Sequence, residues 1–242
     1  DPRFWELEKR MNSGEASVPA LRVRHQWPMN LVPPPDGPWI VMQPWEFGAI
    51  PREWLEPMQL QVDEIWAYTE FVRQTYIKCG VPPEKVFVIP CGVHPGKFHP
   101  DVPRAKLATR KKFKFLFVGG TILRKGPDVL LNAYLRAFTA EDDVCLVIKD
   151  FGGKDVYKGQ TIERSIREAQ ARPGAPEILH LTDDMTPDEL PGLYAACDCL
   201  VHPYRGEGFG LPVLEAMAVG LPVIVTEGGS TDDFAPVEFA HR

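Results

Sequence analysis

Residues 199–225 read CLVHPYRGEGFGLPVLEAMAVGLPVIV and contain a complete strand–helix–strand pattern. The apolar run Cys199–Val201 predicts a short strand. Gly210 then precedes a predicted helix over Leu211–Val219, which has a proline in its first turn, as helix starts often do. A second apolar run, Pro222–Val225, predicts the next strand. A helix that connects two such strands is typical of a parallel β-sheet.

The same alternation extends backwards to residue 113. Strands are predicted over residues 113–118, 144–148 and 177–181, and helices over residues 126–138, 161–171 and 186–196. The last of these helices is expected to begin at Thr186-Pro187-Asp188-Glu189, which has the form of a capping box. Together these elements predict an α/β fold with a parallel, doubly wound sheet, in which ligands bind beyond the carboxyl ends of the strands.

The part of the chain before residue 104 is rich in proline and tryptophan and is less regular. Strands are predicted over residues 39–42, 64–68 and 86–89, and a helix over residues 70–78 that Gly80 ends. The segment from His99 to Lys114 contains prolines and many basic residues and is expected to be a linker. The length and this organisation predict two domains.

Glu207 and Glu215 stand out in the region that follows the linker. Glu215 is the only charged residue between Gly208 and Thr226, and a carboxylate in such a run is costly to bury without a partner. We expect Glu215 about one turn inside the helix and Glu207 in the loop before it, so that both face a helix N-terminus that attracts anions. Two acceptors for hydroxyl groups beside an anion site suit a ligand with sugar and phosphate. A purely structural carboxylate, paired with Arg or Lys, fits the spacing about equally well.

Positive charges follow two of the predicted strands. Arg124 and Lys125 lie in the stretch Gly119–Pro127, where glycines let the backbone approach a ligand and cations can bind a diphosphate. A solvated basic turn is the alternative interpretation. Lys149 follows an apolar run, and three interpretations stay open: a partner of Glu207 or Glu215, a phosphate contact, or an ordinary surface lysine. The glycine stretch matches neither a Walker motif nor GxGxxG, which argues against a dehydrogenase.

The composition argues against several classes of protein. The net charge of −6 argues against a general nucleic-acid-binding protein, which normally carries a basic stripe. No run of about 18 apolar residues appears, so no transmembrane helix is expected. The 5 cysteines form an odd set, and Cys197-Asp198-Cys199 is too small a motif for a zinc site. We therefore expect free thiols in the cytoplasm and no bound metal.

These features together resemble the donor-binding half of a retaining glycosyltransferase with the GT-B fold, in family 4, the glycogen-synthase-like and sucrose-synthase-like group (glycosyl transferases group 1). The E-x7-E pair of Glu207 and Glu215, with its apolar helix, carries the resemblance and is quite specific. The weaker matches are Phe117–Gly120 with Lys125-Gly126, the segment Ile89–Phe98, and Val223–Val225 with Gly228-Gly229. The resemblance covers about Val62 to Asp233.

The resemblance implies two Rossmann-like domains, with parallel doubly wound sheets, that face a cleft. On this basis residues 1–104 are a partial N-terminal acceptor-side domain with its linker. Residues 105–242 are the C-terminal domain that binds the nucleotide-sugar donor. The first domain is short for a full acceptor domain, and the helix that usually crosses back to it is missing after Arg242. The chain is therefore expected to be truncated at both ends.

The resemblance also implies roles for individual residues. Glu207 and Lys125 are expected to be catalytic, since Glu207 would hold the donor sugar and Lys125 would neutralise the departing diphosphate. The other expected donor-binding residues are Gly119, Gly120, Thr121, Arg124, Lys149, Gly208, Phe209, Gly210, Leu211 and Glu215. Glu215 would accept hydrogen bonds from the ribose. His25 and Glu46 are candidates for the acceptor side. The family often has Arg where this chain has Gly120, so phosphate binding here would fall to Arg124.

The predicted function is transfer of a sugar from a UDP-, GDP- or ADP-sugar to a saccharide, lipid or protein acceptor, with retention of the anomeric configuration and with no metal or other cofactor. Base choice is expected to depend on the pocket near Thr182–Met185. The alternative is a non-catalytic module that binds a nucleotide sugar or docks a partner, and a related phosphorylase or epimerase is a weaker one. We expect no nucleic-acid partner and a cytoplasmic location. Peripheral contact with the inner face of the membrane stays open.

Overall fold

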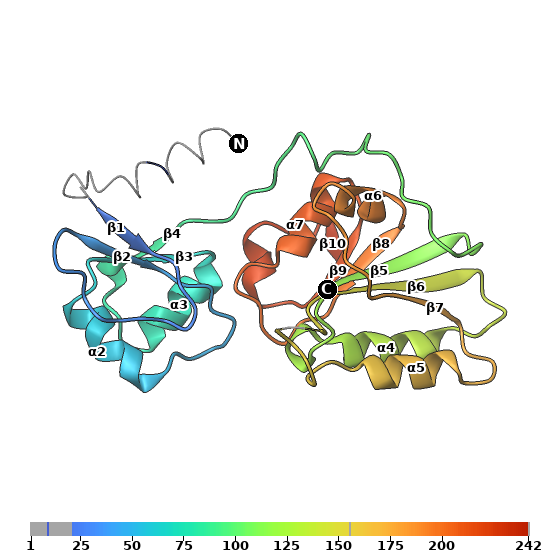
Figure 1. Ribbon diagram of the computed structural model, residues 1–242, viewed down its shortest axis with the longest axis horizontal. Helices are drawn as coiled ribbons and strands as arrows, with labels where there is room; N and C mark the ends of the chain where they lie inside the picture. Colours follow the sequence, from blue (N-terminus) through green and yellow to red (C-terminus); the bar gives the residue numbers. More distant parts are fainter. Residues whose placement is uncertain (1–8, 10–20, 155, 242) are drawn as a thin grey trace. The chain divides into compact units, whose positions relative to one another are not determined.

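The computed structural model describes residues 9, 21–154 and 156–241 and is shown in Figure 1. It divides into two compact units, one that ends at Ile89 and one that begins at Pro90. Each unit has its own parallel sheet and its own hydrophobic core. Within the described ranges, no helix is both long enough and apolar enough to cross a bilayer.

The division between the units precedes the boundary expected at residues 104 and 105, because the expected linker packs on the second unit. Phe98 lies against the core of the second unit, edge-on to Tyr194, with the ring centroids 6.1 Å apart. Further along, the Ala105 N–H donates to the Gly192 carbonyl oxygen at 2.9 Å. These contacts make the segment after Pro90 part of the surface of the second unit.

The first unit is a four-stranded sheet in the order β1-β2-β3-β4, with every neighbouring pair parallel. Its elements are β1 Arg22–Arg24, β2 Trp39–Met42, α2 Arg52–Leu60, β3 Glu64–Ala67, α3 Glu70–Lys78, a 3₁₀ turn at Pro83–Lys85, and β4 Val86–Val88. The helix predicted over residues 70–78 is confirmed, and its start is fixed by the Thr69 side chain, which accepts from the Val72 N–H. The sequence analysis predicts neither β1 nor α2. β1 reads Arg-Val-Arg and α2 contains Pro57, so both lack the usual signals.

The second unit is a six-stranded sheet in the order β10-β9-β8-β5-β6-β7, and all its strands are parallel. Its strands are β5 Phe113–Gly119, β6 Val144–Asp150, β7 Glu177–Leu181, β8 Cys199–His202, β9 Val223–Val225 and β10 Ala240–His241. Its helices are α4 Pro127–Ala137, α5 Glu163–Gln170, α6 Leu190–Ala195 and α7 Leu211–Ala218, with 3₁₀ turns at Leu123–Lys125 and Ser230–Asp233. The predicted α/β fold with a parallel, doubly wound sheet is confirmed.

Helices cover both faces of this sheet. On one face α6 and α7 pack, with Tyr194 and Val213 in a core shared with Val118 of β5. On the other face α4 and α5 pack, with Leu131 and Ile166 in a core shared with the opposite side of β5. Figure 1 shows α4 and α5 together on one side of the sheet and α6 and α7 on the other. Because strand side chains alternate between faces, the apolar run of β5 supplies both cores.

The strand order reverses between β5 and β8. From β5 the chain winds outward to β6 and β7, then returns to form β8 on the other side of β5 and continues outward to β9. The loops that leave the carboxyl ends of β5 and β8 therefore run in opposite directions. In open parallel sheets such a reversal opens a crevice, and ligands bind there. We therefore expect the ligand site among the residues that follow β5 and β8.

One predicted helix begins later than expected. The helix predicted from residue 186 begins at Leu190, after a turn in which the Thr186 N–H and hydroxyl both donate to the Glu189 carboxylate at 2.8 Å. The reason is Pro191, which lacks an N–H. A helix begun at residue 187 would place Pro191 in its interior and lose a hydrogen bond, whereas a start at Leu190 places it in the first turn.

Candidate functional site

The loops that follow β5 and β8 are joined by close backbone contacts. Gly126 has a φ of 70°, and a Cβ atom there would lie only 1.9 Å from the Pro203 carbonyl oxygen. Only glycine fits this position, because it accepts both the left-handed backbone and the close approach. Beside it, the Arg205 N–H donates to the Arg124 carbonyl oxygen at 2.8 Å. The 3₁₀ turn that carries the two basic residues is thereby held against the β8 loop.

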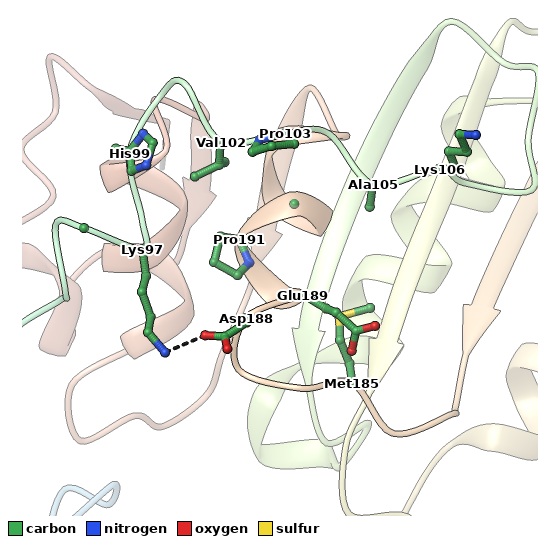
Figure 2. Close-up of a pocket in the computed structure, with 12 residues that line it drawn as sticks. Lys97, His99, Val102, Pro103, Ala105, Lys106, Met185, Asp188, Glu189 and Pro191 are labelled. Atoms are coloured by element: carbon green, nitrogen blue, oxygen red, sulfur yellow. Dashed lines mark hydrogen bonds and ion pairs between the residues drawn. The ribbon is translucent and has the colours of Figure 1, made fainter. Parts of the chain in front are cut away.

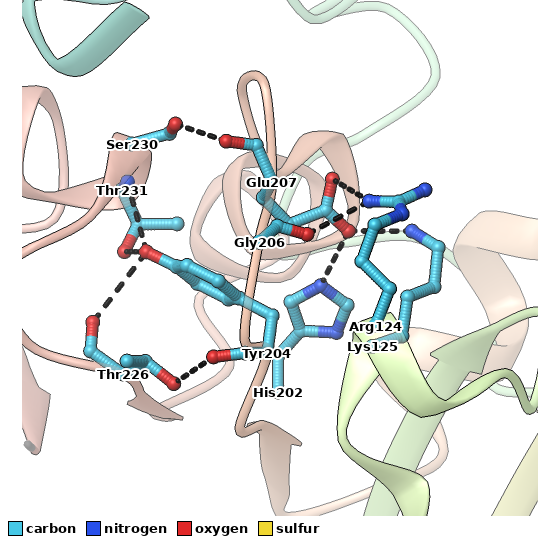
Figure 3. Close-up of polar contacts among 9 residues, drawn as sticks. All are labelled: Arg124, Lys125, His202, Tyr204, Gly206, Glu207, Thr226, Ser230 and Thr231. Carbon is cyan, nitrogen blue, oxygen red and sulfur yellow. Dashed lines mark hydrogen bonds and ion pairs between the residues drawn. The ribbon is translucent and has the colours of Figure 1, made fainter. Parts of the chain in front are cut away.

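Glu207 lies at the centre of a cluster of nitrogen donors, shown in Figure 3. Lys125 Nζ lies 2.5 Å from Glu207 Oε1, and Arg124 Nη1 lies 3.6 Å from Oε2. His202 Nε2 lies 3.2 Å from Oε1. Burial raises the pKa of the Glu207 carboxyl, but the His202 hydrogen bond and the charges of Lys125 and Arg124 outweigh it, so the pKa is lowered well below the ordinary value. Glu207 is therefore a fully ionised, buried carboxylate.

The backbone around Glu207 is fixed from its other side by the 3₁₀ turn after β9. The Ser230 hydroxyl donates to the Glu207 carbonyl oxygen. Tyr204, from the same loop, shares a 2.8 Å hydrogen bond between its hydroxyl and Thr231 Oγ1, and the Thr226 hydroxyl donates to the Tyr204 carbonyl oxygen at 2.7 Å. Figure 3 shows this chain of contacts next to the Glu207 cluster. Hydrogen bonds to the turn after β9 therefore hold this loop from a second side.

Glu215 has a different environment. It lies in the second turn of α7, where its Oε2 accepts a hydrogen bond of 2.7 Å from the Tyr194 hydroxyl of α6. Burial raises the pKa of the Glu215 carboxyl above its ordinary value, and the bond from Tyr194 offsets this only in part. The side chain is half-buried, whereas Tyr194 is wholly buried. Glu215 thus keeps one oxygen that a ligand hydroxyl could reach.

The N-terminus of α7 lies between the two carboxylates in the sequence. Gly210 caps the helix with a φ of 91°, and a Cβ atom there would lie 2.7 Å from Thr231 Cγ2. Among the described residues, the N–H groups of Phe209, Gly210 and Leu211 donate to no acceptor. The first N–H groups of a helix have no partner within the helix and attract anions. The unpaired N–H groups expected at this helix start are therefore present, and the approach of Glu207 and Glu215 to it stays a prediction.

The glycine turn after β5 is held by a buried polar network. Asp150, the last residue of β6, accepts from the Thr121 N–H at 3.0 Å and from its hydroxyl at 2.7 Å. His180 Nε2 lies 3.3 Å from the same carboxylate. The ring of Tyr157 occupies the space that a side chain at Gly120 would need, since a Cβ atom there would lie 2.5 Å from it. Both polar groups of Thr121 are thus used within the protein, and a donor contact from Thr121 stays a prediction.

Lys149 lies apart from the two carboxylates. It is fully buried, donates to the Asp183 carbonyl oxygen at 2.5 Å, and has its ammonium 4.5 Å from the centre of the Phe151 ring. Burial lowers the pKa of Lys149, and nearby aspartates oppose the shift. Lys149 therefore does not pair with Glu207 or Glu215, which was one of its three possible roles. The cations of Arg124 and Lys125 take that place instead.

Two hollows of the second unit lie near residues that the sequence points to. One of about 340 Å³ lies beyond the ends of β6 and β7 and is lined by Asp150 and by Thr182 and Asp184, next to the region expected to choose the base. A larger hollow of about 640 Å³ lies between the segment before residue 107 and the turn that precedes α6 (Figure 2). A Lys97–Asp188 ion pair of 2.6 Å crosses one side of it. Neither hollow is lined by Glu207 or Glu215, so the candidate site is defined by the carboxylate clusters.

The acceptor candidates belong to the first unit. His25 directly follows β1, and its Nε2 lies 3.1 Å from the Tyr68 hydroxyl after β3. Glu46 follows β2 and lies close enough to Tyr76 that its charge adds to burial in raising the pKa of that phenol. Both candidates are therefore near the carboxyl ends of strands, where ligands of parallel sheets bind. Their acceptor role stays a prediction.

His202 is a site residue that the sequence analysis does not single out. It ends β8, is 0% exposed, and its Nε2 contacts the buried Glu207 carboxylate. The available signal is a polar residue directly after the apolar run Cys199–Val201, at the end of a strand that borders the reversal of strand order.

No group of three or more His, Cys, Asp or Glu side chains in the described part of the chain is arranged to hold a metal ion.

Comparison with known proteins identifies the family. Residues 100–235 match the family model described as Glycosyl transferases group 1. A D-inositol 3-phosphate glycosyltransferase of Segniliparus rotundus is 30% identical over 188 residues, which cover 72% of this chain and 41% of that protein. This chain therefore spans less than half the length of that relative.

Solved structures share the fold. A sucrose-phosphate synthase from Thermosynechococcus elongatus superposes with a TM-score of 0.68 at 20% identity, over 99% of this chain and 64% of that one. HepE of Anabaena, solved in complex with UDP and glucose, superposes with a TM-score of 0.60 at 19% identity, over 80% of this chain and 54% of that one. At these identities the likeness concerns the fold.

Proposed function

This chain belongs to the glycosyl transferases group 1 family, and we propose that it transfers a sugar from a nucleotide-diphosphate sugar to an acceptor, with retention of the anomeric configuration and without a metal ion. The observation that carries the proposal is the cluster of Glu207 with Arg124 and Lys125 at the reversal of strand order. A carboxylate for hydroxyl groups and two cations for phosphates meet where such a sheet binds its ligand. The crystal structure of HepE with UDP and glucose supports the class of donor.

Arg124 and Lys125 would bind the diphosphate. Their side chains are 18% and 12% exposed, so their charges are only weakly screened by water. The bond that breaks joins the anomeric carbon to a phosphate oxygen, and negative charge grows on the departing diphosphate. Cations placed where that charge develops stabilise the transition state more than the ground state. The α7 N-terminus, with the N–H groups of Phe209, Gly210 and Leu211, would add to this stabilisation.

The two carboxylates would divide the rest of the donor. Glu215, with one oxygen fixed by Tyr194, would accept hydrogen bonds from the ribose hydroxyl groups. Glu207, which is ionised and rigidly held, would accept hydrogen bonds from hydroxyl groups of the transferred sugar. We assign no covalent nucleophile. Independence from metal is part of the proposal, because Arg124 and Lys125 supply the positive charge that a divalent ion supplies in other transferases. Retention is proposed from the resemblance of the E-x7-E pair, Glu207 and Glu215, to that of retaining enzymes.

The acceptor and the location complete the proposal. The acceptor would be a saccharide, a lipid or a protein, and His25 and Glu46 of the first unit are its candidate contacts. We propose that the protein is located in the cytoplasm. The support is that 5 cysteines are free thiols: Cys79, Cys91, Cys145, Cys197 and Cys199. Free thiols are typical of reducing compartments.

Calorimetric titration tests the proposal. The protein is titrated with UDP, GDP and ADP and with their sugar conjugates, first without metal and then with magnesium. We expect one nucleotide to bind without metal and its sugar conjugate to be consumed when an acceptor is supplied. Glu215→Ala should weaken binding, whereas Glu207→Ala should slow transfer more than it weakens binding. If none of the nucleotides binds under either condition, the proposal is wrong.

A further inference from the structure

His202 has an unusual set of contacts for a buried histidine. It is fully buried at the end of β8, with its ring centroid 5.8 Å from that of Phe117 and 5.7 Å from that of Tyr204. Its Nε2 lies 3.2 Å from Glu207 Oε1, while its Nδ1 has no hydrogen-bond partner among the residues that the structure describes. Buried polar atoms are normally paired, so an orphan nitrogen beside a functional carboxylate calls for an explanation.

The contact with Glu207 determines where the proton of the ring lies. A carboxylate only accepts hydrogen bonds, so Nε2 carries the proton and Nδ1 is bare. Burial lowers the pKa of His202, the Glu207 carboxylate opposes this shift, and the charges of Lys125 and Arg124 add to it. In the free protein His202 is therefore a neutral ring that gives a single hydrogen bond to Glu207.

Glu207 thus has partners of two kinds. Lys125 and Arg124 are long, flexible cations on a 3₁₀ turn, and they are the groups that the proposed function assigns to the diphosphate. His202 is a short side chain on a strand and cannot follow them. When a diphosphate draws the cations away, a buried carboxylate would be left uncompensated, which is strongly unfavourable. Among the side-chain donors that contact Glu207 here, only His202 cannot leave.

We propose that His202 is a positioning residue, which holds the Glu207 carboxylate in place when the diphosphate of the donor draws Lys125 and Arg124 toward itself. The inference rests on the proposed function and adds a residue to its machinery. His202 touches neither the donor nor the reacting atoms. It acts by keeping the carboxylate oriented toward the sugar while the surrounding charges rearrange, and its Nε2–H is the group that does so.

The movement of Lys125 and Arg124 from Glu207 to the diphosphate also couples donor binding to the uptake of a proton. The charged or titratable groups that face the ring are Glu207, Lys125, Arg124 and the Tyr204 hydroxyl. Donor binding moves the positive charge of Lys125 away from His202 and brings in a dianion, and both changes favour a positively charged ring. The pair of His202 and Glu207 then takes up a proton from solvent, with the bare Nδ1 as the free site. Donor affinity should therefore rise as the pH falls.

Three variants separate a positioning role from a structural one. His202→Gln keeps an N–H close to the place of Nε2, and His202→Phe keeps a ring of similar size without any N–H. Tyr134→Phe is the control, because it removes one hydrogen bond of a buried side chain, from the Tyr134 hydroxyl of α4 to the Glu177 carbonyl oxygen of β7. Affinity for UDP-glucose, GDP-mannose and ADP-glucose is measured by calorimetry, and turnover as release of the nucleotide diphosphate at saturating donor.

We expect His202→Phe to lower turnover on the order of 10²-fold, as a displacement of about 1 Å of an active-site group can do. Donor affinity should change far less. His202→Gln should recover most of the turnover, and Tyr134→Phe should reduce thermal stability without altering either quantity. Calorimetry in two buffers of different ionisation enthalpy counts protons. In the pH range where its donor affinity rises, the parent should take up a proton with the nucleotide sugar, and both His202 variants should not.

Four results would contradict a part of the proposal. If His202→Phe turns over like the parent, or if His202→Gln is as slow as His202→Phe, the positioning role is wrong. If His202→Phe loses affinity and turnover together with stability, as a misfolded protein would, His202 is only structural. If the parent binds a donor without proton uptake, the exchange of partners is wrong although the proposed function stands. A parent that binds none of the three nucleotide sugars overturns the proposed function itself.

Discussion

Glu207 and Glu215 are the same residue type, on one continuous loop and helix, and yet the protein treats them in opposite ways. Glu207 is surrounded by Lys125, Arg124 and His202, and its pKa is lowered. Among the residues that the structure describes, the one side-chain hydrogen bond to Glu215 comes from the neutral Tyr194 hydroxyl, and burial raises the pKa of Glu215. Their spacing in the sequence says nothing about this difference. The partners that each carboxylate contacts in the fold decide whether its ionised form is stabilised, as in Glu207, or destabilised, as in Glu215.

The difference in environment predicts different roles for Glu207 and Glu215 in stability and in donor binding. A carboxylate whose charge is already balanced contributes to stability and must exchange partners when a ligand arrives. A carboxylate that is partly desolvated and lacks a cation is unfavourable in the free protein, and ligand hydroxyl groups relieve it. Glu207 should therefore matter for folding and for transfer, and Glu215 for donor binding alone. The predictions below test this contrast, beginning with the largest effect.

The largest effect should come from removing the charge of Glu207. We expect Glu207→Gln to lower the free energy of unfolding by about 3 kcal/mol, because it leaves Lys125 and Arg124 buried beside a neutral group. Urea denaturation at neutral pH measures the change. Glu215→Gln is the matched control and should cost less than about 1 kcal/mol, since it keeps the acceptor for Tyr194. Equal losses in both variants would remove the contrast.

Donor binding should show the reverse order. Glu215→Ala should weaken affinity for the preferred nucleotide sugar by about tenfold, because hydrogen bonds to a charged acceptor are lost. Tyr194→Phe should weaken it by less, since the carboxylate remains but loses its orienting bond. Calorimetry without metal measures both. Affinities of Glu215→Ala that match the parent would mean that this carboxylate does not contact the donor.

The dependence of stability on pH should distinguish the two carboxylates by sign. The pKa of Glu207 is lowered from 4.5 on folding, so its contribution to stability is present above about pH 4.5 and is lost as the pH falls through the folded-state value. The pKa of Glu215 is raised, so its contribution is present below about pH 4.5 and is lost as the pH rises through the folded-state value.

Unfolding curves collected from about pH 3 to pH 7 measure this. Relative to the parent, Glu207→Gln should become less destabilising as the pH falls, with a slope of at most about 1.4 kcal/mol per pH unit. Relative to the parent, Glu215→Gln should become more stable as the pH rises above about 4.5. Parallel curves for both variants would show that neither carboxylate changes its pKa on folding.

The smallest effect should come from a third carboxylate close to the cluster. Arg205 makes two hydrogen bonds to Asp128, at 2.8 and 2.7 Å, but the two side chains are 48% and 31% exposed. Asp128→Asn should change the free energy of unfolding by less than about 1 kcal/mol, because water screens exposed ion pairs. The same urea experiment measures it. A loss as large as that of Glu207→Gln would mean that burial is not what separates the carboxylates.

Much of this protein can be predicted from local signals. Apolar runs and their spacing predict β2, β3, β5, β6, β7 and α3, α4, α5 and α7, and their alternation predicts the parallel doubly wound sheet. The loop position of Glu207 and the place of Glu215 in α7 also follow from Gly210 and Pro212. These features succeed because each depends on residues within a few positions of one another. The late start of α6 shows the limit of this approach, since Pro191 overrides the signal at Thr186.

By itself, the sequence determined most of the elements, the class of sheet and the pair of carboxylates. Only the tertiary structure decided that Lys125, 82 positions away, reaches Glu207, that Lys149 turns to Asp183 instead, and that His202 gives its single hydrogen bond to Glu207. The physical reason is the strand order. β5 lies beside β8 although two strands and three helices separate them in the chain, and this adjacency arises from the packing of helices on both faces of the sheet.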